Sequence, residues 1–228
     1  MATFDTYVSI ATHVYTGPVL QMGEEGPPRG WNIQKREFAS LLGNGFQGGV
    51  YANEKEVIVA FSGTGGGWSM GSQLTADARI GVNVIPNMAG GAFDMVKWAR
   101  KFNAGKPLSI VGHSLGGALA QVVGNWAGAP FVSLNGPGMA SHLKMSAFNI
   151  FKPMQLFRSA ISKNTADTIG ICFTVKGDWI GELGYHVGWE VELPTANNPH
   201  KLLSVWSGIN SKQWKDKEPR DVYSIWPK

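Results

Sequence analysis

The sequence predicts an α/β fold in which a largely parallel central sheet carries helices on both faces. Short apolar runs rich in β-branched residues alternate along the chain with helical stretches, as in sheets whose parallel strands are joined by helical crossovers. One such run, residues 108–111, leads through a glycine-rich turn into an Ala- and Val-rich stretch that begins at Gly116. This pattern indicates a buried strand followed directly by a buried helix.

The length and composition indicate a single domain over residues 1–228. A chain of 228 residues, 43% of them hydrophobic, is long for one average domain and short for two, and it can bury a full core. No apolar run is long enough to predict a transmembrane helix. One cysteine, Cys172, excludes an internal disulfide, and no Cys/His cluster has zinc spacing, so neither metal nor cofactor is expected. The formal charge of +4 is too small to indicate a nucleic-acid partner.

Two helical stretches open the chain, at 3–16 and 31–42, on either side of a connector rich in glycine and proline. Strands are then expected at 46–52, 56–61, 108–111, 131–134, 169–175 and 187–193. The last of these alternates apolar and polar residues, which is typical of an edge strand. An amphipathic helix at 201–206 and a surface extension over 211–228 complete the chain.

The turn after the strand at 108–111 reads Gly112-His113-Ser114-Leu115-Gly116, a G-x-S-x-G motif. A sharp strand-to-helix turn needs glycines where backbone segments meet, and it lifts the serine hydroxyl above the sheet edge. A second copy, at 67–71 around Ser69, comes several residues after the nearest strand and leads into no immediate helix of small residues. Ser114 is therefore the predicted nucleophile, with Ser69 as the alternative.

A serine hydroxyl attacks a carbonyl at neutral pH only with the help of a histidine base that an acid orients. In α/β-hydrolases the acid and then the histidine follow the nucleophile along the chain. Asp178 comes after the strand at 169–175 and a glycine turn, where the acid is expected. His200 lies in a polar loop between the last strand and the last helix, a suitable place for a mobile base. His186, at the start of the strand at 187–193, is the alternative.

The oxyanion of a tetrahedral intermediate needs two N–H donors. One is expected from the backbone of Leu115, the residue after the nucleophile, at the N-terminus of its helix. The other should come from the loop that follows the strand at 56–61, where Thr64 is the candidate.

Several segments together resemble the class 3 (fungal-type) lipases, which are α/β-hydrolases. The similarity covers about residues 43–206 and is carried by segments 45–51, 57–64, 110–120 and 133–138 and by the Gly177-Asp178 and Pro199-His200 positions. It implies hydrolysis of triacylglycerol or phospholipid esters through Ser114, Asp178 and His200, with Thr64 and Leu115 as oxyanion donors and no metal. The chain departs from the family pattern at Ser62, where arginine is usual, and at 137–140, where the family has Pro-Arg-Val-Gly.

Two segments are candidates for contact with lipid. Residues 65–93 mix glycines with large apolar side chains, a composition that suits a lid with glycine hinges. Residues 139–165 contain an apolar stretch seeded with lysine and arginine. This cap-like insertion could lie in a membrane interface or simply cover the core.

The sequence therefore predicts a serine carboxylic-ester hydrolase of the lipase or phospholipase A type, acting on lipid at a membrane or micelle surface. An acyltransferase with the same triad and a non-catalytic hydrolase-fold binding module are the alternatives. The first residues lack the basic and apolar regions of a signal peptide, so a cytoplasmic enzyme is expected by default. The other expectation is an effector exported by a signal-independent route, with an inhibitor protein as its partner.

Overall fold

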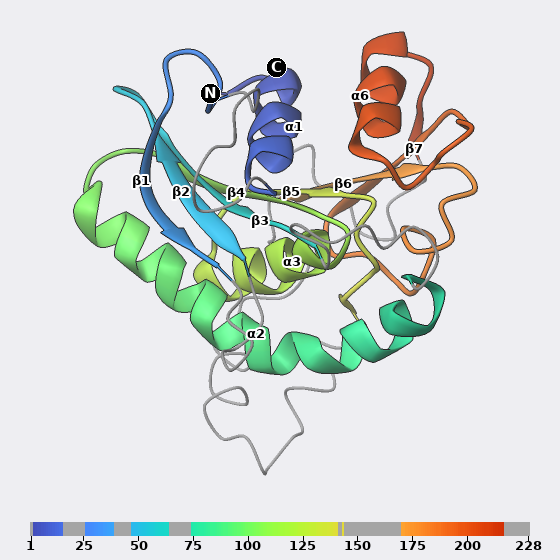
Figure 1. Ribbon diagram of the computed structural model, residues 1–228, viewed down its shortest axis with the longest axis horizontal. Coiled ribbons are helices and arrows are strands. Elements are labelled where there is room, and N and C mark those ends of the chain that lie inside the picture. Colours follow the sequence, from blue (N-terminus) through green and yellow to red (C-terminus); the bar gives the residue numbers. More distant parts are fainter. Residues whose placement is uncertain are drawn as a thin grey trace.

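The computed structural model describes residues 2–15, 26–38, 47–63, 74–140, 143 and 170–216, and between 74 and 87 it describes the backbone alone. Figure 1 shows the elements coloured along the chain. In chain order they are α1 (Phe4–His13), β1 (Asn32–Glu37), β2 (Gly48–Ala52), β3 (Val57–Phe61), α2 (Leu74–Phe102), β4 (Leu108–His113), α3 (Leu115–Ala127), β5 (Phe131–Leu134), β6 (Gly170–Val175), β7 (Trp189–Leu193), α6 (Leu202–Ser211) and β8 (Lys215–Asp216).

The described strands form one eight-stranded sheet, in which they lie side by side in chain order from β1 to β8. The five strands from β3 to β7 are parallel to one another, whereas β1, β2 and β8 pair antiparallel with their neighbours. α2 connects β3 to β4, and α3 connects β4 to β5. The prediction of a largely parallel sheet is confirmed.

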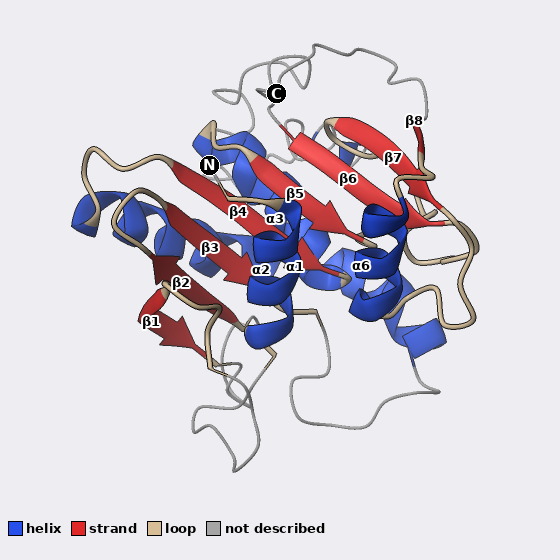
Figure 2. Ribbon diagram, turned by 90° about the horizontal axis from the view of Figure 1, so that it is seen from above, coloured by secondary structure: helices blue, strands red, loops and turns tan. Residues whose placement is uncertain are grey.

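Helices cover both faces of this sheet, with α2 and α3 on one face and α1 and α6 on the other (Figures 1 and 2). Strand β3 shows how the sequence builds two cores. Val57, Val59 and Phe61 are buried with α2 and α3, while Ile58 and Ala60 are buried with α1, because successive strand residues point to opposite faces. A strand covered on both faces is therefore apolar throughout.

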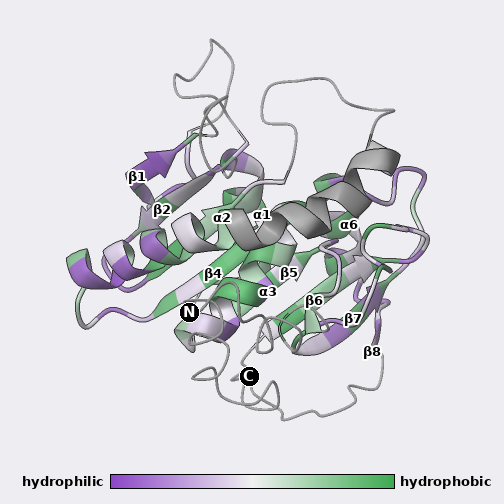
Figure 3. Cartoon of the chain, turned by 90° about the horizontal axis from the view of Figure 1, so that it is seen from below, coloured by the Kyte–Doolittle hydropathy of each residue, from purple (hydrophilic) through white to green (hydrophobic). Residues whose placement is uncertain are grey.

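Residues 32–37 form strand β1, so the prediction of a helix over 31–42 is wrong for them. The run Asn-Ile-Gln-Lys-Arg-Glu is rich in helix-forming residues, but it pairs antiparallel with the buried strand β2. Tertiary pairing thus overrides local propensity. The polar side chains suit the position, because charge on an edge strand discourages pairing with another chain. Figure 3 shows the hydrophilic character of β1.

The strand predicted at 187–193 is β7, but it is not the edge of the sheet as expected. The two-residue strand β8, within the predicted surface extension, pairs antiparallel with it through Val191↔Asp216 and Glu192↔Lys215. Val191 and Leu193 are buried beside α6, whereas the residues between and before them are partly exposed. The alternation of apolar and polar residues therefore reflects that one face of β7 is less covered, and it does not mean that β7 lacks a neighbouring strand.

The segments predicted to contact lipid are described only in part. Residues 74–93 of the predicted lid belong to α2, and its last positions are packed, since Met88, Ala89 and Ala92 are buried in the core. Residues 64–73 and most of 139–165 lie outside the described residues. A lid function for 65–93 and a cap function for 139–165 therefore stay predictions. Among the helices described, none combines the length and the hydropathy that crossing a bilayer requires.

The carboxyl ends of the parallel strands bring four loops to one edge of the sheet. β3 ends just before Ser62, β4 before Ser114 and β5 before Asn135, and β6 ends three residues before Asp178. In sheets of this kind, ligands bind outside this edge.

Candidate active site

Ser114 occupies the turn between β4 and α3 with a backbone φ of 57° and ψ of −127°. A positive φ is uncommon for a residue with a side chain and marks the strained turn that presents a nucleophile in this type of fold. The Ser114 N–H donates to the carbonyl of Leu134 at 3.0 Å, and its carbonyl accepts from Gly117 and Ala118. The neighbouring strand β5 and the first turn of α3 therefore hold this conformation from both sides.

Gly112 and Gly116 allow backbone segments to approach more closely than side chains would permit. A Cβ on Gly112 would collide with the carbonyl group of Gly116, and a Cβ on Gly116 would collide with the carbonyl group of Phe61. Backbone atoms cannot rotate away from such a clash. The glycines of the motif are thus what lets α3 start directly against the ends of β3 and β4.

The structure brings Ser114, His200 and Asp178 together. His200 Nε2 lies 2.9 Å from Ser114 Oγ, and His200 Nδ1 lies 3.0 Å and 2.9 Å from the two carboxylate oxygens of Asp178. Because an ionised carboxylate can only accept, Nδ1 carries the proton and donates to Asp178. Nε2 is then free to accept the hydroxyl proton of Ser114, which is the arrangement of a general base.

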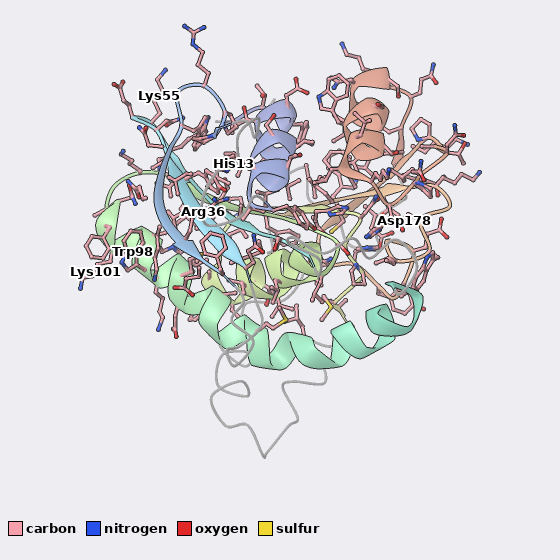
Figure 4. All side chains as sticks on the ribbon, viewed as in Figure 1. His13, Arg36, Lys55, Trp98, Lys101 and Asp178 are labelled. Atoms are coloured by element: carbon pink, nitrogen blue, oxygen red, sulfur yellow. The ribbon has the colours of Figure 1, made fainter. Side chains whose placement is uncertain are left out.

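Asp178 is completely buried, and its surroundings satisfy the carboxylate. The chain turns at Gly177, where φ is 87°, and the Asp178 N–H donates to the carbonyl of Val175 at 2.9 Å. Oδ1 also accepts from the N–H of Ile180 at 3.2 Å. A buried carboxylate is costly unless it is paired and hydrogen-bonded, so these contacts fix both the acid and the ring that it orients. Figure 4 labels Asp178 on the side of the molecule where α6 lies.

His113, the histidine inside the motif, holds the backbone of His200. Its Nε2 lies 2.7 Å from the His200 carbonyl oxygen, which can only accept, so Nε2 carries the proton. Its Nδ1 then accepts from the hydroxyl of Tyr15 at 2.7 Å, and the Tyr15 oxygen accepts from the N–H of Gly63 at 2.8 Å. These bonds link the β3 loop, the β4 turn and the His200 loop.

Burial, and to a smaller extent the neighbouring His200, together lower the pKa of His113 from 6.5 to about 3. His113 is therefore neutral at physiological pH and places no positive charge beside the candidate base. No role for His113 was predictable from the sequence, because its partners Tyr15 and His200 lie 98 and 87 positions away.

The alternative base, His186, has other partners. Its Nε2 lies 2.9 Å from the carbonyl oxygen of Gly136, and its Nδ1 lies 3.2 Å from the carboxylate of Glu190. These contacts tie the loop before β7 to the loop after β5. The alternative nucleophile, Ser69, lies outside the described residues.

Of the two predicted oxyanion donors, the structure describes Leu115 and, for the other, only the residue that precedes it, Gly63. Leu115 is the first residue of α3, so its N–H has no acceptor within the helix. Gly63 approaches Ser114 so closely that a Cβ on it would lie 2.8 Å from Ser114 Cβ. Gly63 therefore lies beside the nucleophile, and Thr64 lies outside the described residues, so its role as an oxyanion donor stays a prediction.

Other reactive groups in the described part of the chain offer no second centre of this kind. No three His, Cys, Asp or Glu side chains there gather closely enough to hold a metal ion. Cys172 is buried with its sulfur against the carbonyl of Val187. Burial raises the pKa of this thiol well above its usual range, which disfavours the thiolate that would act as a nucleophile.

The sheet order and the strand-turn-helix around Ser114 define an α/β-hydrolase fold. Solved structures of fungal lipases share it. One fungal lipase superposes with a TM-score of 0.58 at 16% identity, over 86% of this chain and 80% of that one. Lip2 lipase from Yarrowia lipolytica gives a TM-score of 0.55 at 17% identity, over 83% and 77%. The lipase–propeptide complex from Rhizomucor miehei gives 0.56 at 14% identity, over 86% and 68%.

The chain is also similar in sequence to the extracellular phospholipase A1 of Serratia liquefaciens. The two are 35% identical over 100 residues, which is 44% of this chain and 30% of that protein. No family model matches the chain. The resemblance to fungal-type lipases that the sequence suggested is confirmed. Because the solved structures are only 14% to 17% identical to this chain, what they establish is the shared fold.

Proposed function

We propose that this chain is a serine carboxylic-ester hydrolase of the lipase or phospholipase A type, and that it works through an acyl-enzyme on Ser114. The observation that carries the proposal is the hydrogen-bonded series from Ser114 Oγ through the His200 ring to the buried carboxylate of Asp178. A hydroxyl, an imidazole and a carboxylate in this order make a serine nucleophilic at neutral pH.

In the acylation step, Ser114 Oγ attacks the ester carbonyl carbon while His200 Nε2 takes up the hydroxyl proton. The imidazolium that forms is stabilised by Asp178 through the Nδ1–H bond. It then gives its proton to the departing alcohol as the tetrahedral intermediate collapses to the acyl-enzyme. A water molecule, activated by the same Nε2, releases the fatty acid and restores Ser114.

The developing negative charge on the carbonyl oxygen requires preorganised N–H donors. Leu115 supplies one from the N-terminus of α3, where the helix dipole also favours an anion. Thr64 is proposed as the second. What supports this choice is that the preceding residue, Gly63, lies against Ser114 and donates its N–H to the hydroxyl of Tyr15.

A lipid ester is proposed as substrate because two independent comparisons agree with it. The three solved structures reported above are lipases, and the sequence relative is a phospholipase A1. Exposed apolar side chains also follow the candidate acid and base closely along the chain, namely Trp179 and Leu203. A surface of this kind suits an ester that is presented in an aggregate rather than dissolved in water.

The test is mass spectrometry of products released from mixed vesicles that contain a triacylglycerol and a phospholipid with different acyl chains at its two positions. We expect free fatty acid, together with either a diacylglycerol or a lysophospholipid. The identity of the released acyl group shows which ester bond was cleaved. Ser114→Ala is the control and should release none above background. Transfer of the acyl chain to an added alcohol with no fatty acid formed would contradict hydrolysis.

A further inference from the structure

Asn135 connects the loop that bears the candidate acid to the loop that bears the candidate base. It follows β5 and is completely buried. Its Nδ2 donates to the carbonyl oxygen of Pro199 at 2.7 Å, and its Oδ1 accepts from the N–H of Val175 at 2.9 Å. Pro199 immediately precedes His200, and Val175 is the last residue of β6, whose carbonyl accepts the N–H of Asp178.

The chemistry of the partners fixes the orientation of this amide. The Pro199 carbonyl can only accept and the Val175 N–H can only donate, so the side-chain nitrogen must face Pro199 and the oxygen must face Val175. An apolar residue of the same size would leave the buried Val175 N–H without this partner and would remove the donor to the partly buried Pro199 carbonyl.

The backbone at this position also favours asparagine. Asn135 has a φ of 49°, and its N–H donates to the carbonyl of Phe173 at 2.8 Å. Asparagine adopts this left-handed region more readily than most residues with a side chain. The same turn aims the amide across the ends of the strands, between the two loops.

We propose that Asn135 is a positioning residue for the reaction, in that it sets the direction of the His200 side chain relative to Asp178. The proposal rests on the proposed function and deepens it. The peptide group between positions 199 and 200 contains the carbonyl that Asn135 holds, so fixing that carbonyl limits the rotation that would swing the His200 ring away from Ser114. His113 holds the next carbonyl along, that of His200 itself. Two consecutive carbonyls are thus held by residues from the ends of β4 and β5.

This arrangement has a consequence for the chemical step. Proton transfer depends on a distance of about 3 Å between Ser114 Oγ and His200 Nε2, and a displacement of about 1 Å can cost roughly 100-fold in rate. Loss of the Asn135 donor should therefore lower kcat much more than it changes KM, because no contact of Asn135 to the substrate is involved.

Two variants test the proposal in the full chain. Asn135→Asp keeps the shape and the acceptor for Val175 but replaces the donor to Pro199 by an oxygen. Asn135→Gly removes the side chain and adopts a positive φ without strain, so it keeps the assay informative if the first variant folds poorly. Both are assayed on a water-soluble p-nitrophenyl ester, and the melting temperature is recorded for each.

Asn103→Asp is the matched control. Asn103 is also buried, donates through Nδ2 to Gln34 and to the carbonyl of Ala99, and accepts through Oδ1 from Gln34. It lies just past the end of α2, two residues from Lys101, and Figure 4 shows Lys101 on the opposite side of the molecule from Asp178. The same chemical change is therefore made far from the triad.

We expect kcat to fall about 10- to 100-fold in both Asn135 variants, with KM within about twofold of the unmodified chain. Asn103→Asp should lose thermal stability and keep kcat within about twofold. The proton NMR signal of the His200 Nδ1–H, assigned by its loss in His200→Ala, should shift or broaden in the Asn135 variants alone.

The proposal is overturned if the Asn135 variants keep both kcat and this signal while losing stability as Asn103→Asp does. Failure of the proposed function has a different signature, namely that the unmodified chain hydrolyses no ester. The NMR comparison then still reports whether Asn135 positions His200.

Discussion

At the scale of single residues, His200 is held at both ring nitrogens and at its backbone carbonyl. Its two ring nitrogens contact Ser114 and Asp178, and its carbonyl accepts from His113. The ring itself is a quarter exposed, in contrast to the buried carboxylate that orients it. A base that is fixed in direction but partly exposed can be reached by an ester substrate.

Ser114→Ala should lower ester hydrolysis by several orders of magnitude, because only binding and oxyanion stabilisation remain when the nucleophile is lost. Ser69→Ala is the matched variant in the second copy of the motif, and we expect its activity to stay within roughly tenfold of the unmodified chain. Initial rates on p-nitrophenyl esters compare the two. The reverse pattern would move the nucleophile to Ser69.

His200→Ala should resemble Ser114→Ala, and the double variant should be scarcely worse than either, since members of a triad act as one unit. His186→Ala is the control, because the described contacts of His186 are to Gly136 and Glu190. The measurement is kcat/KM for all four proteins. An inactive His186→Ala beside an active His200→Ala would reverse the assignment of the base.

His113 should make the folded state sensitive to acid. Its pKa is lowered from 6.5 to about 3 in the folded chain by burial, so between these values the unfolded chain binds a proton that the folded chain does not. The free energy of unfolding should therefore fall as pH falls through this window, by at most about 1.4 kcal/mol for each pH unit. Above pH 6.5 this contribution is constant.

His113→Gln tests this dependence, because glutamine retains a side-chain donor but does not titrate. We expect the variant to be less stable than the unmodified chain at pH 7 and to approach it as pH falls toward 4. Urea unfolding at a series of pH values gives the two curves. Parallel curves across this range would show that His113 is not buried in the neutral form.

At the scale of elements, the turn between β4 and α3 both packs closely against β3 and carries the candidate nucleophile Ser114. Gly116→Ala would place a Cβ against the backbone of Phe61, and overpacking of this kind costs about 1–3 kcal/mol of stability or more. Gly90→Ala is the matched control in α2, where a Cβ meets nothing within 4 Å. It should stabilise the chain by roughly 0.4–1 kcal/mol. Thermal melts of both variants make the comparison, and equal effects would contradict the packing account.

The strands that the sequence predicted well are those buried on both faces. The apolar runs at 56–61, 108–111, 131–134 and 169–175 correspond to β3, β4, β5 and β6, and the stretch from Gly116 lies in α3. β1 could not be predicted from its helix-forming residues, because its pairing partner Gly48–Ala52 comes later in the chain. The position of β7 inside the sheet depended in the same way on the distant Lys215–Asp216.

The candidate triad could be predicted because strand ends bring specific residues to one edge of a parallel sheet. The choice of Asp178 and His200 combined this rule with the order of nucleophile, acid and histidine along the chain of α/β-hydrolases. The residues that hold the triad in place could not be predicted from this rule. Tyr15, His113 and Asn135 act through hydrogen bonds to backbone groups of Gly63, His200 and Pro199, which lie far away in sequence. Nearly every residue has such backbone groups, so residue types do not reveal these partners.

At the scale of the whole molecule, the proposed substrate places the chain at a lipid surface. Burial of apolar side chains in an interface contributes about 25 cal/mol per Å², and basic residues add about 1 kcal/mol each near anionic headgroups. Hydrolysis should therefore rise steeply when a short-chain ester passes its solubility limit, and anionic vesicles should be preferred over zwitterionic ones at low salt. Initial rates across that limit, at two salt concentrations, measure both effects. Ordinary saturation below the limit would identify an esterase for dissolved substrates.

Leu203→Ser gives this prediction a structural control. Leu203 is 70% exposed and follows the candidate base, whereas Phe102 is 60% exposed at the far end of α2. We expect Leu203→Ser to lower the rate on vesicles but not on a dissolved ester, and Phe102→Ser to change neither. Equal loss on vesicles in both variants would mean that the lipid contact does not lie beside the site.

The most direct test of the central claim is labelling of the full chain with a fluorophosphonate probe, followed by peptide mass spectrometry. The probe forms a stable adduct only with a serine that an adjacent base has activated. The structure predicts one adduct, on Ser114, in the unmodified chain. It predicts none in Ser114→Ala and strongly reduced labelling in His200→Ala. An unlabelled chain, or an adduct on Ser69 that survives in Ser114→Ala, would contradict the account.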